Sequence, residues 1–267
     1  MAIKRREFLK IAGLSTILEF GGKAAFEMFG PGELKASQRT VLPAPGKKWG
    51  MVVNMSEMDE EIMARCIEAC HHTHNVPNFG NTKEEIKWIW KEKYEHSFPG
   101  QEHEYIAETA KERDFLLFCN HCTNPPCCRV CPTRATWKRE EDGIVMMDQH
   151  RCIGCRFCMA ACPYGARSFN WGDPRKAPKR LNPGFPTNPR YPTRAKGVVE
   201  KCNFCAERLA KGKLPACVEA AGRVKADALI FSDLDDPNSG VRELLRKHYT
   251  IRRRPELGTG PNIYYIV

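Results

Sequence analysis

The stretch Cys152-Ile-Gly-Cys155-Arg-Phe-Cys158-Met-Ala-Ala-Cys162-Pro163 determines how the rest of the chain is interpreted. Its cysteines are separated by two, two and three residues, and the last of them precedes a proline. Closely spaced thiolates on a tight loop reach three irons of one cubane, whereas the fourth cysteine of such a run ligates a different cluster. The run therefore predicts a [4Fe–4S] cluster and a second cysteine group that supplies its fourth ligand.

Two further cysteine groups lie on either side of this run. They read Cys119-x2-Cys122-x4-Cys127-x3-Cys131-Pro132 upstream and Cys202-x2-Cys205-x11-Cys217 downstream. Exchange of fourth ligands between the upstream group and the central run completes two clusters. The predicted ligands are Cys119, Cys122, Cys127 and Cys162 for cluster 1, and Cys152, Cys155, Cys158 and Cys131 for cluster 2.

The downstream group needs one more ligand, and Cys70 supplies it by the same rule. The predicted ligands of cluster 3 are Cys70, Cys202, Cys205 and Cys217. The partner of cluster 3 would need cysteine at four positions, which hold Glu60, Met63, Cys66 and Ala221. Every missing ligand belongs to this one cluster. We therefore predict three [4Fe–4S] clusters, with iron bound by twelve of the fourteen cysteines and with Cys66 and Cys128 left as small buried side chains.

Other uses of cysteine fit this pattern less well. Structural zinc takes four ligands in closed tetrahedral sets, often with histidine, and disulfides do not require regular triplets on tight loops. Covalent haem needs Cys-x2-Cys-His, which the chain lacks, and Cys66-x3-Cys70-His71 is only a loose variant. The histidines beside the cluster loops are expected to border the clusters or the surface. These are His71, His72, His74 and His121.

The N-terminus reads Lys4-Arg5-Arg6-Glu7-Phe8-Leu9-Lys10, followed by a short apolar run, 11–18. A twin arginine before a short apolar run is typical of a Tat export signal, and the run is too short to span a bilayer. We therefore predict a signal segment over 1–36; Ala36 closes a small-residue site suited to cleavage, and whether the segment is cleaved or retained stays open. Tat export suits a cluster protein, because the protein crosses the membrane already folded.

The remaining segments predict an α+β fold with two bacterial ferredoxin-like modules and with helical and Pro-rich insertions. A helix capped by Ser56 or Asp59 holds Cys66 and Cys70. The predicted parts are an outer module over 51–113 and 195–226 that keeps one cluster, an inner module over 114–170, a Pro-rich basic arm over 171–194 and a C-terminal tail over 227–267. The outer module includes a helical insertion over 78–113, with helices at Lys83–Glu95 and Glu102–Arg113. The arm is either a solvated loop or a docking arm, and the tail carries a short helix, Val241–Lys247.

The net charge of +10 does not by itself indicate nucleic acid. Basic side chains offset the negative charge of thiolate-bound clusters, and no arginine-rich helix or aromatic platform marks a nucleic-acid reader. The chain also lacks a Ser/His/Asp set, a phosphate-binding loop and an open metal position. It is therefore expected to transfer electrons and not to act as an enzyme by itself.

Several motifs outside the cysteine spacing resemble one known family. They are His74-Asn75-Val76-Pro77, Cys119-Asn-His-Cys122-x-Asn-Pro-Pro-Cys127, Pro163-Tyr-Gly-Ala-Arg167, and Pro255-Glu-Leu-Gly-Thr259 with Tyr264-Tyr265. From about Met51 to the C-terminus, the chain resembles the four-cluster-type ferredoxin subunits of membrane oxidoreductases. The leader, the degenerate cluster and the stretch from His71 to Pro77 are most similar to the O subunits of Dsr membrane complexes of sulfur metabolism and of Hdr-like menaquinol-oxidising complexes.

This resemblance implies a place on the periplasmic side of the cytoplasmic membrane. The implied partners are a polytopic quinone-binding subunit, a multihaem cytochrome c and other subunits of the same complex. Electrons would pass between the quinone pool and the cytochrome or another redox partner. Two alternatives stay open: an electron-transfer subunit of a molybdopterin reductase of the polysulfide or nitrite type, and a scaffold in which the clusters are only structural.

Overall fold

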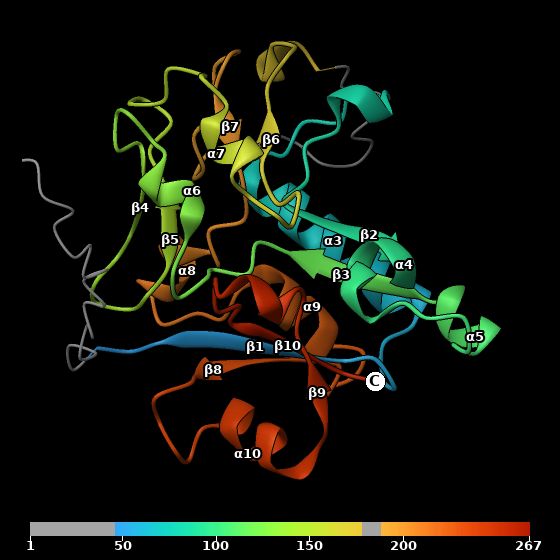
Figure 1. Cartoon of the computed structure of the whole chain (residues 1–267). Helices are drawn as coiled ribbons and strands as arrows, with labels where there is room; N and C mark the ends of the chain where they lie inside the picture. Colours follow the sequence, from blue (N-terminus) through green and yellow to red (C-terminus); the bar gives the residue numbers. More distant parts are fainter. Residues whose placement is uncertain (1–45, 178–187) are drawn as a thin grey trace, which may run out of the picture. The chain divides into compact units, whose positions relative to one another are not determined.

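The computed structural model describes residues 46–177 and 188–267 (Figure 1). The predicted signal segment, 1–36, and the middle of the predicted arm, 178–187, lie outside the described residues. Within the two described ranges, no helix has both the length and the apolar character needed to cross a membrane.

The largest sheet joins segments from the two ends of the described chain (Figure 1). Its strand order is β8 (Leu229–Asp233), β1 (Trp49–Asn54), β10 (Ile263–Ile266) and β9 (Thr250–Ile251). Strand β1 runs parallel to β10 and antiparallel to β8, and it is almost completely buried. The predicted C-terminal tail therefore supplies three strands of a core sheet. The interpretation as a tail was wrong, because the pairing joins residues about 200 positions apart that no local pattern connects.

Helix α10 (Gly240–Lys247) matches the short helix predicted near the C-terminus. The Ser239 hydroxyl caps it by accepting the backbone N–H of Arg242 at 3.4 Å. The buried face of α10 packs Val241 against Val52 and Ile266 of the large sheet. This small core contains none of the predicted iron ligands.

Helix α3 (Glu60–His74) confirms the helix predicted around Cys66 and Cys70. Of the two caps expected for it, Asp59 is the one used, and its carboxylate accepts the backbone N–H of Ile62 at 2.8 Å. Asn75 ends the helix in the left-handed conformation. The buried side of α3 packs against α9 (Ala216–Gly222), which carries Cys217.

The predicted helix over 83–95 was wrong. These residues contain η1 (Thr82–Glu84), the strand β2 (Ile89–Lys93) and the first residues of the one-turn helix α4 (Tyr94–Ser97). Strand β2 pairs with β3 (Asp114–Phe118), and Trp88, Ile89 and Trp90 are all buried. Burial of three consecutive side chains beside a partner strand overrides the weak helical spacing of the aromatic residues. The second predicted helix, 102–113, shrinks to α5 (Glu108–Lys111), and η2 (Pro99–Gln101) lies just before it.

The cysteine loops are framed by short elements, which leaves most of their backbone irregular. The strands are the hairpin β4 (Thr136–Lys138) and β5 (Val145–Met147), and the pair β6 (Ser168–Phe169) and β7 (Val199–Glu200). The helical turns are α6 (Pro126–Arg129), α7 (Phe157–Ala160), η3 (Pro174–Lys176), α8 (Ala206–Leu209) and η5 (Pro255–Leu257). Helices and strands are mixed along the chain, which is compatible with the predicted α+β class.

The C-terminal part of the predicted arm is fixed to the rest of the fold. The side-chain amide of Asn75 donates to the carbonyl oxygens of Asn188 and Tyr191 at 3.0 and 2.7 Å. The guanidinium of Arg194 is buried, where it pairs with Glu200 and donates to the carbonyl of Asn75. Asn188, Tyr191 and Arg194 are therefore anchored to the rest of the fold, whereas the residues between them are exposed.

Candidate iron–sulfur sites

The four cysteines predicted for cluster 1 line one hollow. Cys119, Cys122, Cys127 and Cys162 surround it together with Tyr164, Ala166, Arg167 and three prolines. Three of the four thiols are buried, and Cys162 is half-buried. Cys162 comes from a different loop than the other three, as the exchange of fourth ligands predicts, and all four residues line the same hollow.

The hollow of cluster 1 also contains an unpartnered polar side chain. Asn120 is 1% exposed, and neither its Nδ2 nor its Oδ1 has a hydrogen-bond partner among the described residues. Buried amide groups without partners are rare in folded proteins. A cluster held by the surrounding thiolates would offer sulfur acceptors to the Asn120 N–H groups. The donor set and this side chain therefore both fit a [4Fe–4S] cluster.

The four cysteines predicted for cluster 2 line a second hollow. Cys131, Cys152, Cys155 and Cys158 face it beside Met147, Ile153, Arg156 and Val199. Here Cys155 is exposed, and Cys131 and Cys152 are half-buried. Gly154 lets the loop lie against its neighbour, because a Cβ at this position would approach the carbonyl oxygen of Gly197 to 2.3 Å. This site therefore lies nearer the surface than that of cluster 1.

The cysteines predicted for cluster 3 also come together, and all four are buried. Burial raises the pKa of Cys70 well above its ordinary value, and the neighbouring Cys202, Cys205 and Cys217 raise it further. These effects indicate that Cys70, on α3, lies near the thiols of the loop before α8 and of α9. Burial likewise raises the pKa of Cys202 to about 12.

Burial of these thiols favours their binding to a metal ion over their remaining as free, ionised thiolates. Desolvation disfavours the thiolate unless a cation compensates for its charge. In cluster 1 burial raises the pKa of Cys122 to about 12, with a further contribution from Cys119. Iron binding would supply the missing positive charge and displace these protons, so folding and metal binding are coupled.

Three of the four positions that a fourth cluster would use hold packed side chains. Met63, Cys66 and Ala221 are at most 5% exposed and belong to the main core, between α3 and α9. The Cys66 thiol donates to the carbonyl oxygen of Cys217 at 3.3 Å. Glu60 points outward to form an ion pair with Lys91. The chain thus places a hydrophobic contact where a four-cluster pattern would place iron.

Two buried cationic side chains lie between the thiol groups. Arg167 is 4% exposed, donates to the Sγ of Cys127 at 3.0 Å, and is close enough to Cys158 and Cys119 for their charges to raise its pKa against the opposing effect of burial. Lys201 is 2% exposed and donates from Nζ to the carbonyl oxygen of Cys202 at 2.7 Å. Among the described residues, neither has a carboxylate partner within ion-pairing distance. Their counter-charges are therefore the thiolates.

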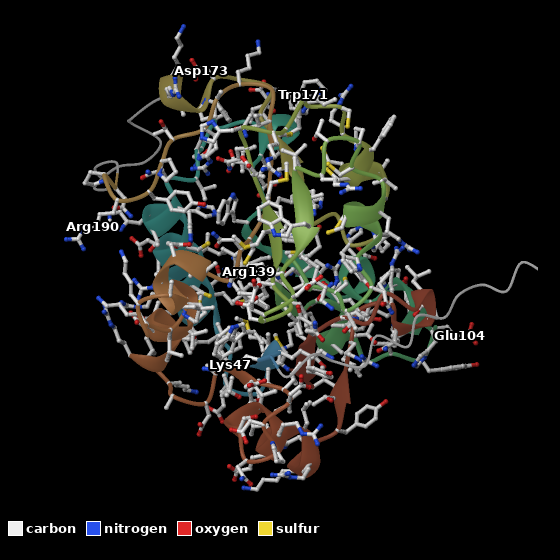
Figure 2. All side chains as sticks on the ribbon, turned by 90° about the vertical axis from the view of Figure 1, so that its left-hand side faces the viewer. Lys47, Glu104, Arg139, Trp171, Asp173 and Arg190 are labelled. Atoms are coloured by element: carbon white, nitrogen blue, oxygen red, sulfur yellow. The ribbon has the colours of Figure 1, made fainter. Side chains whose placement is uncertain are left out.

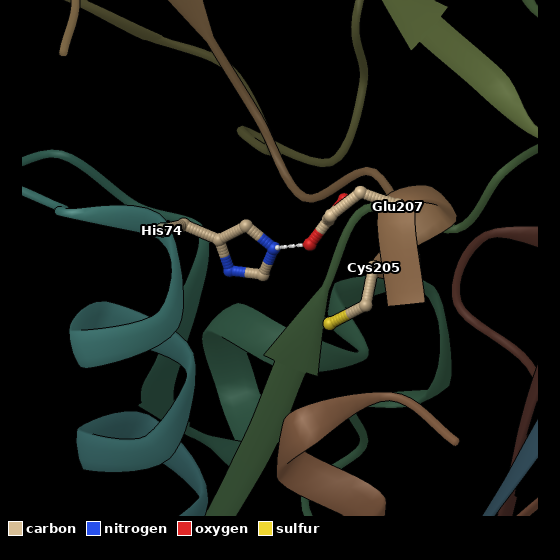
Figure 3. Close-up of side chains that lie close together, drawn as sticks. All are labelled: His74, Cys205 and Glu207. Atoms are coloured by element: carbon tan, nitrogen blue, oxygen red, sulfur yellow. Dashed lines mark hydrogen bonds and ion pairs between the residues drawn. The ribbon is translucent and has the colours of Figure 1, made fainter. Parts of the chain in front are cut away.

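A histidine–carboxylate pair borders the thiols of cluster 3 (Figure 3). The ligand atoms of His74, Cys205 and Glu207 lie within 4.8 Å of one another, and the His74 Nε2 is 2.8 Å from a Glu207 oxygen. Zinc sites also use histidine, cysteine and carboxylate ligands, and a structural zinc site needs four ligands. Because Cys205 belongs to the four-thiol group and Asn203 donates to the other Glu207 oxygen, we interpret the pair as a neighbour of the cluster.

The remaining candidates are not among the predicted ligands, although the Cys128 side chain is hydrogen-bonded to that of Cys127. The His121 ring stacks on Phe204 with centroids 3.7 Å apart, and burial, Lys201 and Arg167 hold its pKa well below the ordinary value. Burial lowers the pKa of His71 to about 4. Cys128 is half-buried, with its sulfur 3.8 Å from the Thr136 hydroxyl.

Sequence reasoning missed four residues that shape the sites. They are Asn120, Arg167, Lys201 and Glu207. Arg167 and Asn120 each occur in a quoted motif, Pro163-Tyr-Gly-Ala-Arg167 and Cys119-Asn-His-Cys122, which was a usable signal. For Lys201 and Glu207 the only signal was that they lie close in sequence to Cys202 and Cys205. Closeness in sequence does not indicate burial.

Comparison with known proteins gives the family. A 4Fe-4S dicluster domain matches residues 115–179. The chain is 40% identical over 237 residues to the Hdr-like menaquinol oxidoreductase iron–sulfur subunit 1 of Archaeoglobus fulgidus, covering 82% of this chain and 83% of the relative. It is 35% identical over 243 residues to the menaquinone reductase iron–sulfur cluster-binding subunit of Nitratidesulfovibrio vulgaris, covering 82% and 88%. It is also 32% identical over 270 residues to the NrfC protein of Escherichia coli, covering 100% and 96%. The chain therefore belongs to the family of ferredoxin-type iron–sulfur electron-transfer subunits that includes the Hdr-like menaquinol oxidoreductase subunits.

Proposed function

We propose that the chain carries three [4Fe–4S] clusters and relays single electrons through them within a membrane oxidoreductase complex. The observation that supports the proposal is that eight of the predicted ligands line two hollows, four in each, and that the charges of Cys202, Cys205 and Cys217 act on Cys70. In this proposal clusters 1 and 2 form an inner ferredoxin-like module. Cluster 3 is the remaining cluster of an outer module.

Bound clusters would supply one-electron redox chemistry, and the residues of the chain set its conditions. The buried thiols exclude water from clusters 1 and 3. Arg167, Lys201 and Asn120 place N–H groups beside the thiol loops, and such hydrogen bonds and charges tune cluster potentials. We assign the chain a non-catalytic role because its relatives are iron–sulfur subunits of oxidoreductases.

The setting of the complex is also part of the proposal. We place the chain on the periplasmic face, exported by the Tat pathway through residues 1–36. There it would sit on a polytopic quinone-binding subunit and exchange electrons with a multihaem cytochrome c or another redox subunit, in a Dsr-type complex of sulfur metabolism. The support is the twin-arginine motif together with two relatives named for menaquinol or menaquinone chemistry.

An alternative function is electron transfer for a molybdopterin reductase. Relatives of this chain include the iron–sulfur subunit of an arsenate respiratory reductase of Shewanella sp., 36% identical over 212 residues, and a subunit of the tetrathionate reductase of Salmonella typhimurium, 40% identical over 150 residues. Affinity purification of the native complex separates the two functions. A haem and quinone-binding assembly supports the first, and a large molybdenum subunit supports the second.

Cluster content tests the central proposal with a matched pair of variants on one helix. Anaerobically purified protein should contain about twelve iron and twelve acid-labile sulfide per chain, with interacting EPR signals after reduction. Cys70→Ala should lower the iron content to about eight, whereas Cys66→Ala, one turn earlier on α3, should leave it at about twelve. About sixteen iron atoms in the unmodified protein, or loss of iron in Cys66→Ala alone, would contradict the assignment. Clusters that cannot be reduced reversibly would instead support a structural scaffold.

A further inference from the structure

The three thiol groups differ in their access to the surface. All four cysteines of cluster 3 are buried, as are three of the four in cluster 1. In cluster 2, by contrast, Cys155 is exposed. Electron transfer between proteins requires a close approach of the two cofactors. Judged by the burial of its thiols, the site of cluster 2 therefore lies nearest the surface of the three and is the most accessible to a partner.

The surface around Cys155 is unusually apolar for an exposed loop. Ile153 is 66% exposed, Phe157 is 60% exposed and Trp171 is 45% exposed. Ile153 and Arg156 line the same hollow as Cys155, and Phe157 directly follows Arg156. We refer to Ile153, Cys155, Arg156, Phe157 and Trp171 as the Cys155 face. Grouped apolar side chains at a surface mark an interaction site more often than scattered ones do.

The Cys155 face is held in place by the structure beneath it. The Arg156 guanidinium lies 4.7 Å from the centroid of the Trp171 ring and 5.4 Å from that of Phe169. Phe169 and Trp171 also contact each other edge to face, with centroids 4.7 Å apart. The exposed Trp171 side chain is therefore held in place before any partner binds, which reduces the entropy lost on docking.

Basic side chains predominate in the segments that form this face, and Asp148 and Asp173 directly border these segments in the sequence. The chain contains no Asp or Glu from residue 126 to 139 or from residue 149 to 172, the two segments that supply the cysteines of cluster 2. Four arginines in these segments are exposed, namely Arg129, Arg134, Arg151 and Arg156. Of these, Arg151 pairs with Asp148 at the margin. Arg134 lies between Thr133 and Ala135, which line the hollow, and α6 with Arg129 contacts α7.

We propose that the Cys155 face docks a redox protein whose own cofactor is exposed inside an acidic rim. This proposal rests on the proposed function, because it assigns the place where electrons enter or leave the chain. The apolar side chains would form the dry centre of the contact, and the arginines would pair with the acidic rim. Opposite charges of this kind steer encounter and set orientation more than they add affinity.

The test uses the full chain with its clusters and a small acidic c-type cytochrome as the probe. The chain is reduced with dithionite, freed of excess reductant and mixed with the ferric cytochrome in a stopped-flow instrument. One electron then passes from the reduced chain to the haem iron, which changes from Fe(III) to Fe(II), and no bond is made or broken. The second-order rate should fall steeply as salt is added.

Charge-reversal variants locate the docking site. Arg129→Glu/Arg134→Glu should slow reduction of the acidic cytochrome about tenfold at low salt and should abolish most of the salt dependence. Phe157→Ser should slow it at all salt concentrations. The matched control is Arg242→Glu/Arg246→Glu on α10, which should leave the rate within about twofold of the unmodified protein. Figure 1 shows α7 at the top and α10 at the bottom, and Figure 2, turned about the same vertical axis, also shows Trp171 near the top.

The outcomes distinguish failure of the proposed docking site from failure of the proposed electron-transfer function. Failure of the clusters to accept electrons from dithionite, seen by EPR, would overturn the proposed function. Normal reduction with equal slowing in both charge-reversal pairs would overturn only the docking site. Self-association through Phe157 in sedimentation, or binding of this face to anionic phospholipid vesicles without any effect on the cytochrome rate, would also overturn it.

Discussion

The guanidinium of Arg167 donates to the Sγ of Cys127 across 3.0 Å, and both side chains are buried. A second N–H···O contact, 2.8 Å long, joins Arg167 to the Thr136 hydroxyl and fixes the orientation of the fork. A buried charge requires a counter-charge, and in the described chain only thiolates are near enough to Arg167 to act as one. This relationship makes Arg167 the main electrostatic link between the sites of clusters 1 and 2.

Arg167→Gln should lower the reduction potentials of clusters 1 and 2. Reduction adds negative charge to a cluster, and the positive charge of Arg167 stabilises that state. A hydrogen bond to a charged group is worth about 1.5–3 kcal/mol, so a shift of up to about 65–130 mV is expected for a one-electron couple. An EPR-monitored redox titration measures it, with Arg167→Lys as partial rescue and Arg242→Gln as the exposed control. Unchanged potentials in a variant that retains its iron would refute this role.

Glu207→Gln should have the opposite effect at cluster 3. Burial alone would raise the pKa of Glu207, but hydrogen bonds from His74 and Asn203 hold it below the ordinary value, so the carboxylate is charged at neutral pH. Its charge also raises the pKa of Cys70, Cys202 and Cys205. Removing it should raise the potential of cluster 3 and leave those of clusters 1 and 2 within error. The same redox titration reports all three, and a fall in the potential of cluster 3 would contradict the assigned geometry.

Arg194→Met should strongly destabilise the fold. Arg194 and Glu200 form a fully buried ion pair, and Trp88 donates to the same Glu200 oxygen at 2.8 Å. Leaving one charge buried without its partner costs about 3–5 kcal/mol. Resistance to guanidinium, followed by loss of the visible cluster absorption, measures the change. The double variant Arg194→Met/Glu200→Gln should recover part of the lost stability. A double variant less stable than Arg194→Met would show that packing dominates.

Removal of iron should unfold the cysteine loops before the large sheet. The strands β1, β8, β9 and β10 contain none of the predicted ligands, and β1 is almost completely buried. After anaerobic chelation, hydrogen exchange of the amides in 119–131 and 152–162 should accelerate at least about tenfold, while those of β1 stay protected. Equal acceleration throughout the chain would show that the sheet also depends on iron.

The sequence predicted which cysteines, far apart in the chain, bind the same cluster. It could do so because cluster ligation imposes a fixed spacing of cysteines that is visible in the sequence. The crossed assignment of Cys131 and Cys162 matches the two hollows that the structure forms. The helix with Cys66 and Cys70 was also predictable, since Asp59 and the buried positions of α3 are local signals. The number of bound clusters stays a prediction that the iron count will decide.

Other features required the tertiary structure. Residues 83–95 carry a helical spacing of aromatic side chains, yet pairing with β3 makes them a strand. The C-terminal residues showed no sign of pairing with β1. Both errors concern contacts between distant segments, which strand patterns do not encode.

The sequence by itself determined the chemistry of this protein: which cysteines group together, and that those groups suit iron–sulfur clusters. Ligand spacing is a covalent property of the chain, so it can be read directly. Only the tertiary structure decided that Arg167, Lys201 and Glu207 lie beside the thiols, and that Cys155 is exposed among apolar and basic side chains. Burial and electrostatic surroundings arise from packing between segments far apart in the chain, and for this reason no local motif specifies them.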